Sequence, residues 1–210
     1  MGSDLLKIKL AIEEKNGQFL AKVREFSASV SHLKRNTHGI ELNFKARCLE
    51  RLYVLMNLAT ENCSSGFPIA ASLMARGVLE TAGLLTLFER KMEKVPKNAI
   101  QERLDTVKKF VFATKKFGNE KRTIHALDCV RALNPYQSDV ELLYDILCEA
   151  VHPNWLGVSQ FREFQPESNE AHEHDELVSA TVFQSLLLGH KAAGAAKLLI
   201  LMDGVVPAPR

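Results

Sequence analysis

The sequence predicts an all-α protein, with residues 1–210 forming a single domain built as an antiparallel bundle of about six to seven helices. Nearly every segment repeats its apolar residues with the helical period, and no run alternates polar and β-branched residues as a half-buried strand would. Short turn segments join long helical patterns, as antiparallel neighbours in a bundle require. The chain is long enough to bury one sizeable core.

Each expected helix follows from its apolar stripe and from the residues at its ends. Gly39 after the first pattern and Gly118 after the fourth are stop signals, because glycine readily adopts the conformation in which helices end. Pro68 falls in the first turn of the third helix, where its missing N–H costs nothing. Ser138 or Asp139 is placed to cap the sixth helix. The expected helices cover residues 4–34, 40–62, 67–94, 97–117, 121–133, 139–152 and 175–203.

Residues 153–174 are expected to be irregular, because Pro153 and Pro166 interrupt them and their end is acidic. A segment of that length is long for a bundle connection and is more often functional or disordered than incidental. The final helix carries small residues that would allow close approach of another helix, namely Gly189, Ala192, Ala193, Gly194, Ala195 and Ala196.

The composition indicates a soluble globular protein, since 46% of the residues are hydrophobic and 25% are charged. The net charge of +2 is small, so attraction to nucleic acid would require a local basic patch. The four cysteines form no C-x-x-C unit, which indicates reduced thiols and a cytoplasmic protein. We expect no membrane span, because polar or charged residues interrupt the apolar runs 66–88 and 177–202.

Arg76 and Glu80 are the only charged residues between Cys63 and Phe88, in the most apolar of the expected helices. They lie one helical turn apart on an apolar face, where a charge must be paired with its neighbour or with another helix. Two interpretations remain open. The pair is a structural ion pair that sets helix register, or each side chain reaches a third group at a functional site.

His152 ends the stretch "LCEAVHPNW" of residues 147–155, directly before Pro153. Glu141, Asp145 and Glu149 lie on the same polar arc of the expected helix, which would favour a protonated imidazole. Such a group suits a general acid or a phosphate contact. The alternative is a histidine that only satisfies carbonyls at the end of the helix.

Two motifs carry a resemblance to a known family. Arg76-x-x-x-Glu80 on an apolar helix, followed by "YDILCEAVHPN" from Tyr144 to Asn154, resembles a family of uncharacterised bacterial all-helical proteins with R-x-x-x-E and Ser/Cys-x-x-Val-His-Pro motifs. That family looks like the HEPN group of helical bundles, many of which are metal-independent ribonucleases in toxin–antitoxin and phage-defence systems. The resemblance covers residues 40–160 in outline and implies a HEPN-like core with an RNA-directed function.

The chain departs from the HEPN nuclease signature, an arginine four to six residues before the histidine. Residues 145–148 are Asp, Ile, Leu and Cys, so that arginine is missing. A ribonuclease would therefore need Arg76, from another helix, to hold the scissile phosphate while His152 handles the proton. The predicted catalytic residues are Arg76, Glu80, Tyr144 and His152, assembled where the third and sixth helices meet.

A second basic feature is the segment "KKFVFATKKFGNEKR" of residues 108–122. Its phenylalanines would pack inward while its basic side chains contact phosphates, although such a run is usually a solvated helix face. The candidate nucleic-acid-binding residues are Lys108, Lys109, Lys115, Lys116, Lys121 and Arg122.

No cofactor and no metal site are expected, because no phosphate-binding glycine loop or H-E-x-x-H motif is present, and "HEHDE" at residues 172–176 is interpreted as solvated. The expected partners are RNA, a second copy of the chain and an antitoxin-like protein. The leading hypothesis is RNA binding or cleavage in a stress or defence setting. The alternative is a non-catalytic interaction protein that dimerises through the final helix, with Arg76, Glu80 and His152 as a structural network.

Overall fold

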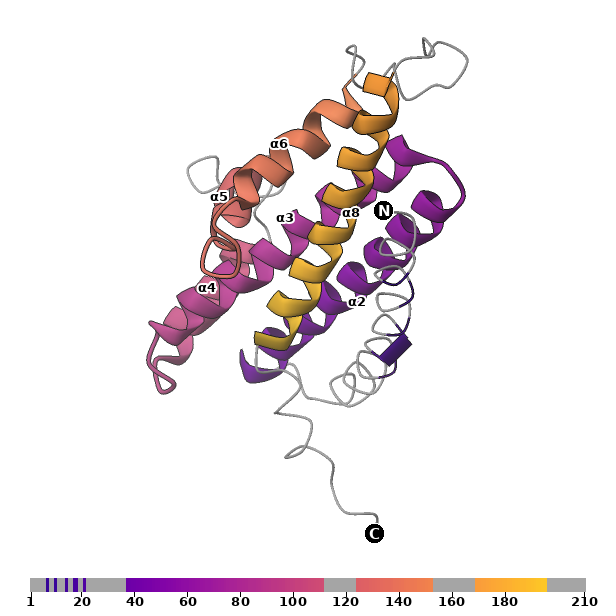
Figure 1. The fold of residues 1–210 in the computed structure, drawn as a ribbon. Coiled ribbons are helices and arrows are strands. Elements are labelled where there is room, and N and C mark those ends of the chain that lie inside the picture. The colour runs from indigo at the N-terminus through magenta and orange to yellow at the C-terminus, as the bar shows by residue number, and fades with distance from the viewer. Residues whose placement is uncertain are drawn as a thin grey trace.

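The structure, a computed structural model, describes residues 37–111, 124–152 and 169–195, together with positions 7, 10, 14, 17, 18 and 21. Within this part of the chain the protein is all-helical, with six helices and no strand (Figure 1). The helices are α2 (Thr37–Ser64), α3 (Pro68–Glu93), α4 (Ile100–Val111), α5 (Ala126–Arg131), α6 (Val140–Val151) and α8 (Asn169–Ala195).

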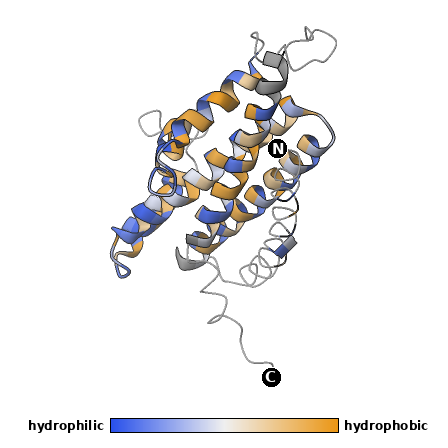
Figure 2. Ribbon diagram, in the orientation of Figure 1, coloured by the Kyte–Doolittle hydropathy of each residue, from blue (hydrophilic) through white to orange (hydrophobic). Residues whose placement is uncertain are grey.

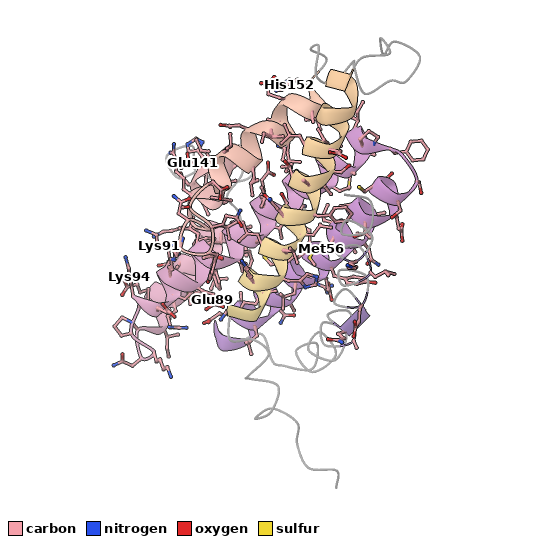
Figure 3. The ribbon with its side chains drawn as sticks, viewed as in Figure 1. Met56, Glu89, Lys91, Lys94, Glu141 and His152 are labelled. Atoms are coloured by element: carbon pink, nitrogen blue, oxygen red, sulfur yellow. The ribbon has the colours of Figure 1, made fainter. Side chains whose placement is uncertain are left out.

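α3 is the central helix of the bundle and contacts α2, α4, α5, α6 and α8. Its side chains supply much of the core, because α3 carries apolar residues toward nearly every helix that packs against it. The buried apolar residues of α3 are Ala71, Ala75, Val78, Leu79, Ala82, Leu85, Phe88 and Met92. Figure 2 shows hydrophilic residues gathered at the end of the bundle where α3 meets α4, the end at which Figure 3 labels Lys91 and Lys94.

The small residues of α8 are used for packing inside the chain. A Cβ atom added at Gly189 would lie 2.8 Å from Val78 Cγ1 on α3 and 3.3 Å from Met56 Sδ on α2. Ala192 and Ala193 are buried in the same core. These three positions therefore face α2 and α3 of the same molecule, and they are not available as a dimerisation surface.

A second close approach joins α3 to α5. A Cβ atom added at Gly83 would clash with the backbone carbonyl of Cys129, so only a glycine lets α5 lie this close to α3. Cys129 and Val130 of α5 are buried against α3 as a result. The short α5 thereby packs against α3 around Gly83, and α6 packs against α3 nearer its N-terminus, around Arg76.

The C-terminal half of α3 packs against α2 and α4 through aromatic rings. The ring centroids of Phe88 and Phe110 lie 5.1 Å apart, and those of Phe88 and Phe44 lie 4.6 Å apart. The edge-on and tilted arrangements are the ones that aromatic pairs prefer. This cluster attaches α4 to the central helix.

Beside these rings lies a largely buried charge network that the sequence analysis did not anticipate. Lys45 Nζ lies 3.2 Å from Glu41 Oε1 and 2.8 Å from Glu89 Oε1. Arg103 Nη2 donates to Glu41 Oε2 at 2.6 Å, and its Nη1 donates to the carbonyl oxygen of Val95 at 3.0 Å. Burial raises the pKa of Glu89, and the nearby Lys45 only partly opposes it. The network ties α2, α3 and α4 together by charge-assisted hydrogen bonds.

The all-α prediction is confirmed for the described residues, and the expected helices at 40–62, 67–94 and 139–152 correspond closely to α2, α3 and α6. Pro68 stands at the first turn of α3 as predicted. Most of the expected helix 4–34, Gly118 and most of the irregular segment lie outside the described residues, and the six described positions between 7 and 21 are helical.

Several boundaries were wrong. Gly39 lies inside the first turn of α2 and does not end a helix there. Residues 97–99 form a turn before α4, and α5 spans only Ala126–Arg131, because His125 is extended and a series of turns follows Arg131. α8 begins at Asn169, so the backbone of residues 169–174 is helical and not irregular. Asp139 occupies the N-cap of α6, but its side chain makes no capping hydrogen bond.

Among the described residues, α3 is the helix that is long and apolar enough to cross a membrane. However, 67% of its most apolar stretch is buried inside the chain. A core helix of a soluble protein has the same length and composition, so the burial of α3 is consistent with a soluble protein.

Replacing Gly83 with alanine tests the α3–α5 approach. We expect Gly83→Ala to lower the free energy of unfolding by about 2 kcal/mol, because the added methyl group forces α5 away from α3. The matched control is Gly194→Ala in α8, where an added Cβ meets nothing within 4 Å. The control should be neutral or stabilise by up to about 1 kcal/mol, as alanine favours a helix over glycine. Urea denaturation would measure both, and a Gly83→Ala variant as stable as the control would contradict the packing.

Candidate functional site

Arg76 and Glu80 of α3 meet Tyr144 of α6 in a compact polar triad. Arg76 Nε donates to Glu80 Oε1 at 3.0 Å and to the Tyr144 hydroxyl oxygen at 3.2 Å. The Tyr144 hydroxyl in turn donates to Glu80 Oε1 at 2.7 Å. Each member of the triad therefore contacts the other two. The tyrosine is the third group that the Arg76–Glu80 pair reaches.

The Arg76 guanidinium is oriented but only partly covered. Its carbon lies 5.3 Å from the centroid of the Tyr144 ring, so a cation–π contact supports the hydrogen bonds. The side chains of Arg76 and Glu80 remain 33% and 30% exposed, which places the pair at the surface edge of α3. In the described residues, the hydrogen bonds of Arg76 use Nε alone, and both terminal nitrogens are left to donate elsewhere.

The triad shifts the pKa of its own members. Partial burial lowers the pKa of Arg76, but the hydrogen bond and the field of Tyr144 outweigh it, so the net shift is upward and the cation is stabilised. Burial and the hydrogen bond to Glu80 raise the pKa of Tyr144 to about 12. At neutral pH the triad therefore contains a neutral tyrosine and a permanent guanidinium cation.

Cys148 joins this site, although it was not among the predicted site residues. It follows Tyr144 by one turn of α6, and its half-buried thiol interacts with both Tyr144 and Arg76. Burial raises the pKa of this thiol, while the Arg76 charge and the Tyr144 hydrogen bond oppose the rise. The spacing of four residues from Tyr144 is the signal that could have identified it.

His152 is not brought into contact with the triad. It forms the C-cap of α6, is exposed and lies at the end of the bundle opposite Lys91 and Lys94 (Figure 3). Eight residues separate it from Tyr144, which corresponds to about 12 Å along a helix and about 80° around it. His152 thus lies two turns beyond Tyr144 along α6 and about a quarter turn around it, and it is exposed where Tyr144 is buried.

The basic segment does not extend the triad. Lys108 and Lys109 are exposed on α4, while Lys115, Lys116, Lys121 and Arg122 lie outside the described residues. α4 packs through Phe110 onto Phe88, which is twelve residues along α3 from Arg76 and hence about 18 Å away. The two lysines and Arg76 therefore belong to different regions of the surface.

A further arginine, on α2, contacts the residue of α3 that follows Glu80. Arg51 of α2 donates from Nε to Thr81 Oγ1 of α3 at 3.2 Å, beside Glu80. Its side chain is exposed, and its terminal nitrogens, like those of Arg76, form no hydrogen bond with a described residue. The two guanidinium groups therefore contact α3 at positions five residues apart, Arg76 on the α6 side and Arg51 at Thr81 on the α2 side.

The chemistry available at this site is anion binding. Within the described part of the chain, no three His, Cys, Asp or Glu side chains converge as metal ligands. Both arginines present planar donor edges, which match the oxygens of a phosphate or a carboxylate. The side chains of His172, His174 and Asp175 lie outside the described residues.

Comparisons with known proteins give no independent assignment. No protein-family model, no curated protein and no solved structure matches the chain significantly.

The raised pKa of Tyr144 predicts a pH-dependent stability. The hydroxyl ionises near its ordinary pKa of 10.0 in the unfolded chain but at about 12 in the folded one. Its stabilising contribution is therefore complete below pH 10 and is lost as the pH rises to about 12. We expect the free energy of unfolding of the native chain to approach that of Tyr144→Phe across this window, measured by urea denaturation at stepped pH.

The control for this titration is Tyr136→Phe, which removes a partly buried hydroxyl outside the triad. Its difference from the native chain should stay constant over the same pH range. A constant difference for Tyr144→Phe as well would show that folding does not raise the pKa of the Tyr144 hydroxyl.

Proposed function

We propose that the protein is a HEPN-like RNA-binding protein whose phosphate contacts are Arg76 and Arg51. The observation that carries the proposal is the Arg76 guanidinium, which Glu80 and Tyr144 hold by Nε while both terminal nitrogens remain able to donate. Because the side chain is already oriented, little rotamer entropy is lost when an anion binds. This arrangement favours a ligand with paired oxygens, such as a phosphodiester.

Glu80 supports the same proposal by its position. It accepts hydrogen bonds from Arg76 and Tyr144 on Oε1, so it orients the guanidinium without covering its outer edge. A pair that served only to neutralise buried charge would be covered more completely than the 33% and 30% exposures of these side chains. The partial exposure therefore favours a ligand-binding role over a purely structural one.

The choice of single-stranded RNA comes from the resemblance to HEPN-like proteins and from the side of α6 on which His152 lies. Tyr144, Cys148 and His152 follow one another at four-residue spacing along α6, with Tyr144 buried, Cys148 half-buried and His152 exposed. A strand that leaves the exposed edge of Arg76 and runs over the outer surface of α6 would reach His152 at the end of that helix. The small net charge of +2 is no obstacle, since two or three local phosphate contacts suffice for weak binding.

The competing proposal, a non-catalytic dimerisation protein, keeps only part of the small-residue surface named for it, with Gly194 exposed. Gly189, Ala192 and Ala193 of α8 pack inside the chain, so they cannot also form a helix–helix contact between copies. If the triad were only structural, Arg76→Ala would leave Glu80 with the Tyr144 hydrogen bond and cost about 1 kcal/mol, because the pair is partly exposed.

Salt-dependent RNA binding tests the proposal. We expect Arg76→Ala to weaken binding of a fluorescent single-stranded RNA about tenfold, since a charge-assisted contact is lost. The slope of log affinity against log salt concentration should fall by about 0.7, the value for one phosphate contact on a single strand. Arg51→Ala should reduce the slope by a similar amount. Fluorescence anisotropy at several salt concentrations measures both quantities.

The charge-matched control is Lys91→Ala, which removes an exposed cation at the opposite end of α3 (Figure 3). It should leave the affinity and the slope nearly unchanged. Equal slopes for the native chain and for Arg76→Ala would contradict the proposal. A loss of affinity in Lys91→Ala as large as that in Arg76→Ala would contradict it as well.

Cleavage is a narrower function and requires a separate experiment. His152 lies about 12 Å along α6 beyond Tyr144, and among the described residues no hydrogen bond joins it to the Arg76 triad. We therefore expect the native chain, incubated with RNA and a metal chelator, to leave the RNA intact on a denaturing gel. RNA products with 2′,3′-cyclic phosphate ends that are absent with His152→Ala would contradict this expectation. A DNA strand of the same sequence, which has no 2′-hydroxyl, is the control and should stay intact.

A further inference from the structure

Exposed apolar side chains lie beside the two arginines on α2 and α3. Val54 and Leu73 are 51% and 50% exposed, and Leu58 is 38% exposed. Val54 follows Arg51 by three residues and Leu58 follows Val54 by four, so the three share one side of α2. Leu73 precedes Arg76 by three residues and shares its side of α3 in the same way. We call Val54, Leu58 and Leu73 the aliphatic strip.

Two contacts between α2 and α3 give the register of the strip. Arg51 Nε donates to Thr81 Oγ1 at 3.2 Å, and a Cβ atom added at Gly77 would lie 3.1 Å from Leu55 Cδ1. A step of four residues along α2 therefore corresponds to four residues back along α3, as in antiparallel neighbours (Figure 1). One further step brings the α2 and α3 members of the aliphatic strip to about the same level.

The strip is close enough to the arginines for one nucleotide to reach both. Three residues of a helix correspond to about 4.5 Å along its axis, which is the offset of Leu73 from Arg76 and of Val54 from Arg51. In a nucleotide, the ribose alone separates the phosphate from the base. A phosphate bound by either guanidinium group can therefore place its own base over the aliphatic strip.

The strip has the chemistry of a surface for planar bases. About half of each of its side chains is covered by neighbouring residues, so together they form a shallow apolar surface. Valine and leucine side chains have no hydrogen-bond donor or acceptor, so they contact the face of any base alike. In a duplex the faces of the bases are stacked on one another and out of reach. The strip therefore favours an unpaired nucleotide, with little preference for sequence.

An anionic lipid surface matches these features less well. Peripheral membrane sites bury projecting apolar side chains in the bilayer, whereas those of the aliphatic strip are half-covered. Hydrogen bonds to Tyr144 and Thr81 orient the guanidinium groups of Arg76 and Arg51. Oriented cations next to an apolar surface match a strand in which phosphates and bases alternate.

We propose that the aliphatic strip contacts the bases of single-stranded RNA while Arg76 and Arg51 bind its phosphates, so that the protein selects unpaired nucleotides without regard to sequence. This inference rests on the proposed RNA binding. It adds a second, uncharged part to the site, which contributes affinity that salt does not screen.

Fluorescence anisotropy with an intact RNA strand, and with an abasic strand that carries the same phosphates, tests the inference on the full chain. We expect the native chain to bind the intact strand about tenfold more tightly than the abasic one. Leu73→Ala should weaken binding of the intact strand about fivefold, because apolar contact area is lost. It should leave binding of the abasic strand unchanged. The slope of log affinity against log salt concentration should also stay unchanged, because no charge is removed.

Val54→Ala is a second variant of the strip and should have the same effects as Leu73→Ala. The matched control is Leu142→Ala, which truncates a leucine that is 58% exposed. Leu142 precedes Tyr144 by two residues and so lies on nearly the opposite side of α6 from it. The control should bind both strands as the native chain does.

Equal affinity of the native chain for the intact and abasic strands would overturn the inference. So would a loss in Leu142→Ala as large as that in Leu73→Ala, or binding of phosphatidylglycerol vesicles in preference to RNA. The phosphate contact fails by a different readout, namely a salt slope that Arg76→Ala leaves unchanged. A slope that falls in Arg76→Ala, together with native affinity in Leu73→Ala and Val54→Ala, would overturn the base contact alone.

Discussion

The position of α3 at the centre of the bundle is the constraint on which the rest of the structure depends. A helix that contacts five others must be apolar around most of its circumference, and α3 buries Val78, Leu79, Leu85 and Phe88 completely. The two charged residues of α3 that precede Phe88 can then occupy only the narrow strip that the neighbouring helices leave open. Arg76 and Glu80 lie on that strip, where Tyr144 of α6 completes their hydrogen bonds. The polar triad is thus a consequence of how α3 is covered.

Close backbone approach determines how completely α3 is covered. Gly83 admits the backbone of α5, and Gly189 lets α8 pack against Val78 and Met56. Small residues at these contacts shorten the distance between helix axes and allow core side chains to interdigitate. The same contacts explain why Gly189, Ala192 and Ala193 of α8 pack inside the chain, whereas Gly194 is exposed.

The structure separates its charged groups by their degree of burial. Glu41 and Lys45 are nearly inaccessible and, with Glu89 and Arg103, form a network that holds α4 to α2 and α3. Arg76 and Arg51 form fewer hydrogen bonds with the protein and keep their outer donors exposed. Buried charges that pair with one another have a structural role. Oriented but incompletely satisfied charges are those that can bind a ligand, which is why the proposed RNA contact lies at the triad.

The sequence by itself determined the all-α class, the course of α2, α3 and α6, and the need of Arg76 and Glu80 for a partner. These follow from local periodicity and from the cost of unpaired charge, which act within a few turns of helix. The resemblance had grouped Tyr144 with this pair, but only the tertiary structure decided that its hydroxyl contacts both members, that Cys148 joins it, and that His152 lies two turns away. It also decided that Glu41, Lys45, Glu89 and Arg103 meet, and that Arg51 reaches Thr81. Such contacts join residues far apart in the chain, and they depend on the relative rotation and offset of packed helices, which a helical period does not encode.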